Sequence, residues 1–98
     1  MNDKIYSIIG IARKGGKVAI GFDVTCSDVE KNKSVLVLMT ADASDKTKKN
    51  IQFVCEKYNC KFVEYGEKEL LGKSLGRKMV GVVSIRDNNI ASYILNNV

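Results

Sequence analysis

Three cations surround a pair of glycines near the start of the chain, in the stretch best suited to bind an anion. Arg13 and Lys14 precede the glycine pair that ends at Gly16, and Lys17 follows it. A further flexible position, Gly21, comes where another helix can begin. Glycine allows a ligand to approach the backbone closely, and the free N–H groups at the start of a helix attract negative charge. The spacing therefore predicts an anion-binding surface.

A second cationic loop lies late in the chain, where Arg77 and Lys78 follow Gly76. If the sheet is mixed, both loops could lie at one end of it and form one basic surface. The alternative is that these charges only keep the protein soluble. That alternative is favoured for the lysines at 46, 48 and 49, which lie on the outer face of an amphipathic helix.

Composition indicates an ordinary globular protein with a single domain over residues 1–98. The chain is 45% apolar and 28% charged, which is typical of a folded protein and not of a disordered one. Its net charge is +5, with a sequence pI near 9.2. This surplus favours polyanionic partners such as RNA, DNA or an anionic membrane, without selecting one.

Signatures of catalysis are missing from the sequence. The chain has no histidine for acid–base work near neutral pH. Its glycines match neither a phosphate loop nor a dinucleotide fingerprint, because the Lys14–Lys17 turn follows a helix rather than a strand. Cys26 occupies a core-facing helical position, and Asp42 is placed to start a helix. We therefore expect a non-enzymatic protein without a cofactor.

Cysteine usage indicates a reducing compartment. The three cysteines show no CxxC spacing, which argues against both a disulfide framework and a zinc site. No apolar run approaches the roughly 20 residues that span a bilayer. The N-terminus lacks the pattern of a signal peptide. We expect a cytoplasmic protein that binds neither metal nor membrane.

Hydrophobic periodicity predicts nine alternating elements. Helices are expected over about residues 3–14, 22–31, 44–58, 67–74 and from 88 onward, and strands over 17–20, 35–39, 61–65 and 80–85. The run at 35–39 is apolar throughout, as in a central strand buried on both faces. This alternation predicts an α/β fold, a three-layer α-β-α sandwich with a four-stranded mixed sheet.

Side-chain types also predict helix starts and buried faces. Asn2 or Asp3 is expected to cap the first helix, Ser44 the third and Asp87 the last. In the second helix Asp28 is expected to face water, and in the fourth helix Leu70 and Leu71 are expected to point inward.

Several motifs occur in the order seen in the ribosomal protein L7Ae/L30e superfamily. They are Gly16-Lys17-Val18, Gly21 before the second helix, Leu36 to Ser44 (LVLMTADAS) and Leu71 to Gly76 (LGKSLG). The chain most resembles the bacterial YlxQ-like branch, because Asp42-Ala43-Ser44 is followed by Thr47-Lys48-Lys49. The resemblance covers nearly the whole chain.

This resemblance implies an RNA-binding protein that recognises kink-turn RNA and associates with ribosomes. It assigns RNA contacts to three regions, which here are Gly16 and Lys17, Gly21 to Ser27, and Gly76 to Met79. Ribosomal or other structured RNA, and through it the ribosome, are the expected partners of a monomeric protein. The start of the second helix would approach nucleotide edges and phosphates with its free N–H groups.

The base-reading positions depart from the pattern of kink-turn binders. These proteins usually carry Gly-x-Asn-Glu followed by a lysine, where this chain has Gly21, Asp23, Val24 and Ser27. An ionised Asp23 could accept hydrogen bonds from a guanine edge, or it could simply stabilise the first turn of its helix. Two hypotheses therefore stand: an RNA-binding protein, and a protein-interaction module that kept the fold and lost specific kink-turn recognition. A small-ligand binder or enzyme is a weaker third.

Overall fold

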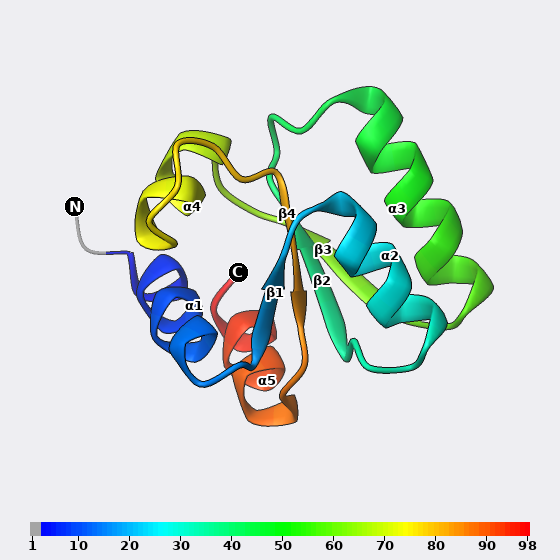
Figure 1. Ribbon diagram of the computed structural model, residues 1–98, viewed down its shortest axis with the longest axis horizontal. Coiled ribbons are helices and arrows are strands. Elements are labelled where there is room, and N and C mark those ends of the chain that lie inside the picture. The colour runs from blue at the N-terminus through cyan, green and yellow to red at the C-terminus, as the bar shows by residue number, and fades with distance from the viewer. Residues whose placement is uncertain (1–2) are drawn as a thin grey trace.

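The computed structural model describes residues 3–98, which form five helices and four strands in strict alternation (Figure 1). In chain order these elements are α1 (Lys4–Lys14), β1 (Val18–Ile20), α2 (Phe22–Glu30), β2 (Leu36–Met39), α3 (Asp45–Lys57), β3 (Lys61–Glu64), α4 (Lys68–Ser74), β4 (Val82–Ile85) and α5 (Asn88–Asn97). The predicted order is confirmed. None of the helices in this part of the chain is long and apolar enough to cross a membrane.

The four strands form one mixed sheet in the order β1-β4-β2-β3. Strand β4 runs antiparallel to both of its neighbours, β1 and β2, whereas β2 and β3 are parallel. As a result β1, β2 and β3 finish where β4 begins. We call this end of the sheet the carboxyl edge, and the opposite end, where β4 finishes, the amino edge.

Helices cover both faces of the sheet, which confirms the three-layer architecture (Figure 1). Helices α1, α4 and α5 pack on one face, and α2 and α3 pack on the other. Residues of β2 alternate between the two cores: Leu36 and Leu38 join the first, and Val37 and Met39 join the second. Because this strand contacts helices on both sides, all four of its residues are buried, as its apolar sequence predicts.

Side-chain caps begin three helices as predicted. The carboxylate of Asp3 accepts hydrogen bonds from the N–H groups of Ile5 and Tyr6. Ser44 caps α3, and Asp87 caps α5 through the N–H of Ile90. The alternative cap of the first helix, Asn2, lies outside the described residues.

Two predictions about side-chain orientation are wrong. Asp28 does not face water but is buried at 3% exposure. Its carboxylate accepts hydrogen bonds from Ser84 in β4 and from Arg86, which directly follows this strand. Leu70 is 41% exposed while Leu71 is fully buried. Helix α4 is only seven residues long and packs through one narrow face, so two adjacent leucines cannot both point inward.

Candidate nucleic-acid interface

Gly21 connects β1 to α2 at the carboxyl edge and leaves the start of this helix open. Its φ of 112° is a conformation that residues other than glycine rarely adopt. Its N–H donates to the carbonyl of Val82, and its own carbonyl accepts the first helical hydrogen bond from Thr25. No side chain caps the helix at Gly21, and no heavy atom outside the adjacent residues lies within 4 Å of the position that a Cβ would occupy. The N–H groups of residues 22–24 are therefore left for a partner from outside the helix.

The first turn of α2 carries the side chains that a ligand would meet next. Asp23 is exposed, and Ser27 lies one turn further along the same side of the helix, half-buried. Between them Val24 contributes no hydrogen-bonding group. The predicted residues at Gly21, Asp23 and Ser27 are thus brought together, although only two of them offer polar side chains.

The basic loop after α4 is held in place by the end of that helix. Gly76 follows the helix with a φ of 70°, and its N–H donates to the carbonyl of Lys73. The N–H of Arg77 then reaches back to the carbonyl of Gly72 at 2.8 Å. These two bonds form a Schellman motif, which satisfies the last carbonyl groups of the helix. The side chains of Arg77, Lys78 and Met79 remain exposed on this tethered backbone.

The same loop ends at the carboxyl edge, beside the start of α2. The N–H of Val80 donates to the carbonyl of Lys68, which returns the chain along α4. The carbonyl of Gly81 accepts from the N–H of Thr40, and the carbonyl of Val82 accepts from Gly21. Figure 1 shows the loop crossing above the sheet before it enters β4. The end of the loop at 76–79 therefore reaches the edge where Gly21 to Ser27 begins, whereas its start at Gly76 lies at the end of α4.

Residues of the Thr40 to Ser44 motif stabilise this edge through hydrogen bonds. Thr40 is fully buried and bonds to the start of β4. The N–H of Ala41 donates to the carbonyl of Gly66, and the carboxylate of Asp42 accepts from the N–H of Lys68 at 3.0 Å. These contacts join the end of β2 to the start of α4. The side chain of Asp42 thus bonds to the first residue of α4, whereas Ser44 caps α3.

The third predicted region, Gly16 and Lys17, lies at the opposite end of the sheet. The turn leads into the start of β1, and the carbonyl of Lys17 accepts from the N–H of Arg86 at the end of β4. The ammonium group of Lys17 lies 3.8 Å from the carboxylate of Asp87. Gly16, with a φ of 73°, ends α1 in a helix cap. The expectation that the two cationic loops share one end of the sheet is therefore wrong for Lys17, which lies at the amino edge.

The side chains of Arg13 and Lys14 have different neighbours from the side chain of Lys17. The guanidinium of Arg13 donates to the carbonyl of Leu75 at 3.4 Å, which places it beside the start of the basic loop. Lys14 borders a groove between α1 and α4, together with Lys73. Arg13, Lys14, Arg77 and Lys78 thus lie around the ends of these two helices. The N–H of Lys17 also donates to the carbonyl of Ala12 in α1, but its side chain is directed to Asp87.

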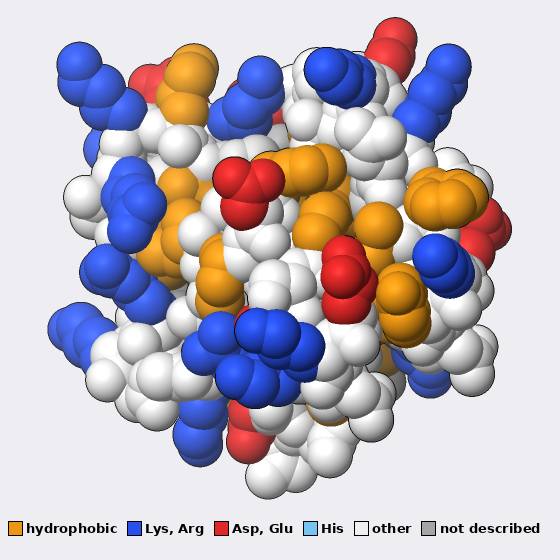
Figure 2. All heavy atoms as spheres, turned by 45° about the vertical axis from the view of Figure 1, so that its right-hand side comes forward, with side chains coloured by type: hydrophobic (Ala, Val, Ile, Leu, Met, Phe, Trp, Pro, Cys, Tyr) orange, Lys and Arg blue, Asp and Glu red, His pale blue; other side chains and the backbone are white. Residues whose placement is uncertain are grey.

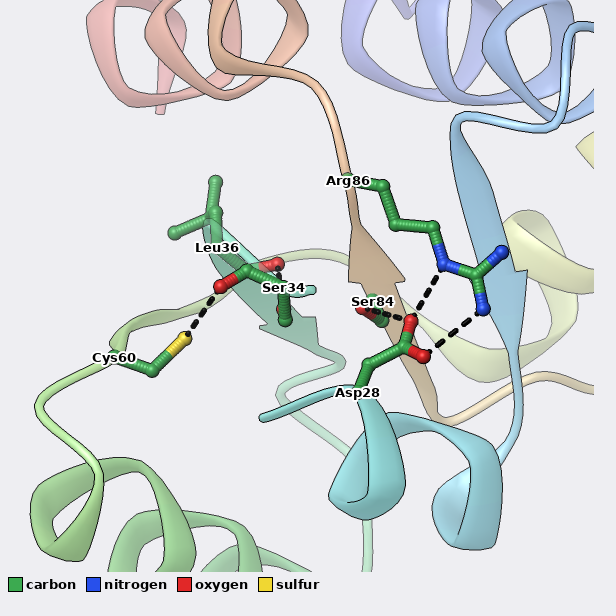
Figure 3. A network of polar contacts seen from close by, with 6 residues as sticks. All are labelled: Asp28, Ser34, Leu36, Cys60, Ser84 and Arg86. Atoms are coloured by element: carbon green, nitrogen blue, oxygen red, sulfur yellow. Dashed lines mark hydrogen bonds and ion pairs between the residues drawn. The ribbon is translucent and has the colours of Figure 1, made fainter. Parts of the chain in front are cut away.

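Sequence patterns did not reveal the polar cluster formed by Asp28, Ser84 and Arg86 (Figure 3). The Asp28 carboxylate accepts two hydrogen bonds from Arg86 and one, at 2.9 Å, from the Ser84 hydroxyl. Burial by itself would raise the pKa of Asp28, but these hydrogen bonds and the Arg86 charge outweigh it and lower the pKa below its usual value. The cluster joins α2 to the amino edge, so Arg86 is a structural cation. No local signal marks it, because Asp28 lies 56 and 58 residues before its two partners.

Charge alone does not select an interface on this molecule. Figure 2 shows basic side chains spread around much of the visible surface, with one group near its lower centre and acidic and hydrophobic groups between them. Some of the cations are already engaged: Lys48 donates to the carbonyl of Ala41 and pairs with Glu64 at 3.1 Å. Residues 3–98 contain no group of three or more acidic or cysteine side chains placed to hold a metal ion. Backbone geometry at the carboxyl edge is the more selective feature.

Comparison with known proteins agrees with this architecture. The protein named RNA-binding protein YlxQ from Bacillus subtilis (strain 168) is 28% identical over 90 residues, which cover 92% of this chain and 90% of that relative. The protein of the same name from Enterococcus faecium is 30% identical over 90 residues, covering 90% of this chain and 84% of that relative.

Solved structures share the fold at lower identity. A Bacillus halodurans C protein of unknown function superposes with a TM-score of 0.91 at 22% identity, covering 97% of this chain and 96% of that chain. The Giardia lamblia 15.5kD RNA binding protein superposes with a TM-score of 0.79 at 21% identity, covering 100% of this chain and 90% of that chain. Residues 3–95 also match the sequence pattern of a known family. By that match, the chain belongs to the Ribosomal protein L7Ae/L30e/S12e/Gadd45 family.

Proposed function

We propose that this protein binds structured RNA at the carboxyl edge of its sheet. The observation that carries the proposal is the arrangement around Gly21: an uncapped helix start under open space, beside a basic loop whose backbone is tethered to α4. The names of three similar proteins, two YlxQ proteins and the Giardia protein, describe them as RNA-binding. Their likeness to this chain supports the same class of ligand here.

The two regions of the edge would contact RNA in different ways. The N–H groups at residues 22–24 would donate to phosphate oxygens or base acceptors, aided by the positive end of the helix dipole. Arg77 and Lys78 form no ion pair within residues 3–98, so their charges are available to phosphates. Met79 is 65% exposed between this loop and the sheet, and its side chain can cover the apolar surface of a base or ribose.

The finer form of the proposal is a kink-turn-like RNA, bound in the cytoplasm in association with ribosomes. Kink-turn recognition depends on base contacts at positions where this chain has Asp23, Val24 and Ser27. Each good bidentate base contact contributes about 1–3 kcal/mol of discrimination. We therefore expect this protein to prefer a kink-turn over a straight duplex by less than a protein with the full Gly-x-Asn-Glu pattern.

Titration of RNA binding in increasing salt tests the proposal. The probes are a kink-turn RNA and a straight duplex of the same length, bound to the wild-type protein, an R77A/K78A variant and a K46A/K49A control that removes equal charge from α3. We expect the loop variant to bind both RNAs more weakly and to flatten the log-log salt slope by about 0.9 for each duplex phosphate that the protein no longer neutralises. The control should change little. The proposal would be overturned if the wild-type protein bound neither RNA detectably at low salt, or if the loop variant and the control variant weakened binding equally.

Lys17 provides a second, independent check on where the RNA lies. The resemblance places Lys17 in the interface, but its ammonium group faces Asp87 at the amino edge. We expect K17A to retain wild-type affinity and salt slope. A reduction in affinity as large as that of R77A/K78A would instead indicate that the RNA extends around β1 to the opposite end of the sheet.

A further inference from the structure

A groove lies between α1 and α4, and its lining includes none of the residues of the proposed RNA interface. It has a volume of about 540 Å³ and is open to solvent along its length. Ile11 and Leu70 line it, and both are large apolar residues left in water: Ile11 is 66% exposed and Leu70 is 41% exposed. Exposed apolar side chains that line one groove mark a docking surface more often than isolated ones do.

The floor of the groove is backbone, because the two helices touch where Gly10 meets Ser74. A Cβ built on Gly10 would lie 2.7 Å from the carbonyl oxygen of Ser74. Because Gly10 has no side chain at this contact, the backbones lie close together and the neighbouring side chains form the sides of the groove. A second, smaller hollow lies on the other side of Ile11, between α1 and Tyr93 of α5. Ile11 is therefore a ridge between two concave surfaces.

The walls of the groove are basic. Lys14 and Lys73 line it, and Lys4 lines the neighbouring hollow. Within residues 3–98 none of these three lysines forms an ion pair. The one carboxylate in the groove, that of Asp3, is already engaged, since it accepts from two backbone N–H groups of α1 and from the hydroxyl of Tyr65 at 2.6 Å.

We propose that this groove binds an acidic amphipathic helix of a partner protein. Apolar side chains of that helix would cover Ile11 and Leu70, and its carboxylates would meet Lys14, Lys73 and Lys4. Helix α1 has 11 residues, so the wall is about 16 Å long at 1.5 Å per residue, which accommodates two to three turns. This is the helix-in-groove mode of peptide recognition. The inference does not depend on RNA binding, because it uses other residues.

Other occupants fit the groove less well. RNA gains affinity from aromatic stacking as well as from cations. The nearest ring, that of Tyr6, is half-buried, tilted against Tyr65, and accepts the N–H of Glu67 through its hydroxyl. A second copy of this chain, paired symmetrically through the same surface, would bring its lysines against identical lysines. A partner with apolar and acidic side chains satisfies both features of the groove.

Site-specific crosslinking in cells tests the proposal directly. A photo-crosslinking amino acid replaces Ile11 in the full chain, and the control replaces Phe53, which is similarly exposed at 65% but lies on α3 across the sheet. We expect a protein adduct at position 11 that is at least tenfold stronger than at position 53, persists after nuclease treatment, and forms equally in an R77A/K78A background. The crosslinked segment should be helical in pattern, with apolar residues at i, i+3 or i+4 and i+7 and flanking carboxylates.

Reconstitution with a purified peptide completes the test. The crosslinked segment is synthesised, and its affinity is measured for the wild-type protein, I11E and F53E, after circular dichroism has shown that all three are folded. We expect I11E to lose at least tenfold in affinity and F53E to bind like the wild type. Absence of an adduct above the control, a nuclease-sensitive adduct, an adduct to a second copy of this chain, a segment without acidic residues, or equal affinity of I11E and wild type would each overturn the proposal.

Discussion

Gly72 of α4 lies directly beneath the carbonyl of Lys78 in the basic loop. A Cβ at Gly72 would approach the carbonyl oxygen of Lys78 to 2.7 Å and that of Arg77 to 2.9 Å. Because both obstacles are backbone atoms, no side-chain rotation can relieve the contact. The shape of the proposed RNA-binding loop therefore depends on the absence of a side chain one helical turn before it.

Substitution of Gly72 by alanine should move the loop as well as destabilise the protein. We expect a decrease of about 1–3 kcal/mol in the free energy of unfolding, which is typical of overpacking, together with weaker RNA binding. Denaturant unfolding and RNA titration measure the two effects. Gly15→Ala is the control, because a Cβ there would meet its nearest neighbour at an ordinary 3.7 Å. Equal behaviour of the two variants would contradict the close contact.

Substitution of Gly21 by alanine should destabilise the protein through backbone strain alone. A Cβ at this position meets nothing within 4 Å, but the φ of 112° is strained for any L-residue. We expect a cost of about 1–3 kcal/mol in unfolding free energy. The new methyl group would also project into the space where RNA is proposed to approach. RNA affinity measured well below the melting temperature, where the variant is folded, should therefore fall; unchanged affinity would argue against an interface at Gly21.

Removal of Arg86 should be among the more damaging single changes in the chain. The side chain of Asp28 is 4% exposed, so R86A would leave a buried carboxylate without its cation. We expect destabilisation by about 3 kcal/mol, near the lower end for broken buried pairs because Arg86 itself is partly exposed. K17A breaks the exposed pair with Asp87 and should cost less than about 1 kcal/mol. Thermal or denaturant unfolding of both variants measures the difference.

Acid should narrow the difference in stability between wild type and R86A. The folded-state pKa of Asp28 is lowered by its partners, so its contribution to stability is complete above the unfolded pKa of about 3.9 and is lost as pH falls through the folded pKa. Removing Arg86 takes away the main group that lowers this pKa, so R86A should lose less stability than the wild type as pH falls through this range. The unfolding free energies of the wild type and R86A, measured from pH 7 down to the acid transition, should therefore converge. A constant gap across this range would show that Asp28 does not titrate with the pair.

The three cysteines should differ in reactivity toward an alkylating reagent. Hydrogen bonding with Cys55 and with the Ser34 side chain lowers the pKa of Cys60 to about 7, although burial opposes this. Interaction with Cys60 and burial raise the pKa of Cys55, and burial raises that of Cys26. Since the thiolate is the nucleophile, Cys60 should be modified first, with a rate that rises through about pH 7. Mass spectrometry after brief iodoacetamide treatment measures the order, and initial labelling at Cys55 would contradict it.

Local sequence patterns were enough to predict every helix and strand. The apolar run at 35–39 indicated a strand buried on both faces, and the caps at Ser44 and Asp87 marked helix starts within a residue. These features are encoded over a few consecutive residues, by side-chain period and by hydrogen bonds to nearby N–H groups. The same reasoning located the cations of the basic loop beside Gly76 and the helix start at Gly21.

Relationships between distant segments could not be predicted in this way. The water-facing assignment of Asp28 failed because helical periodicity does not reveal that a cation 58 residues later will reach the same position. Lys17 and Arg77 were expected at one end of the sheet. The antiparallel pairing of β1 with β4 instead places Lys17 at the amino edge, whereas the loop that contains Arg77 leads to the carboxyl edge.

Short stretches of sequence thus establish the identity and order of the elements, the turns that need glycine and the basic character of two loops. The folded chain adds which turns share a surface, which cations remain free, and that α1 and α4 enclose an apolar groove with basic walls. Strand order and helix packing are determined together, because the helices must bury both faces of the sheet at the same time. Because that requirement involves the whole chain, no short window of sequence contains it.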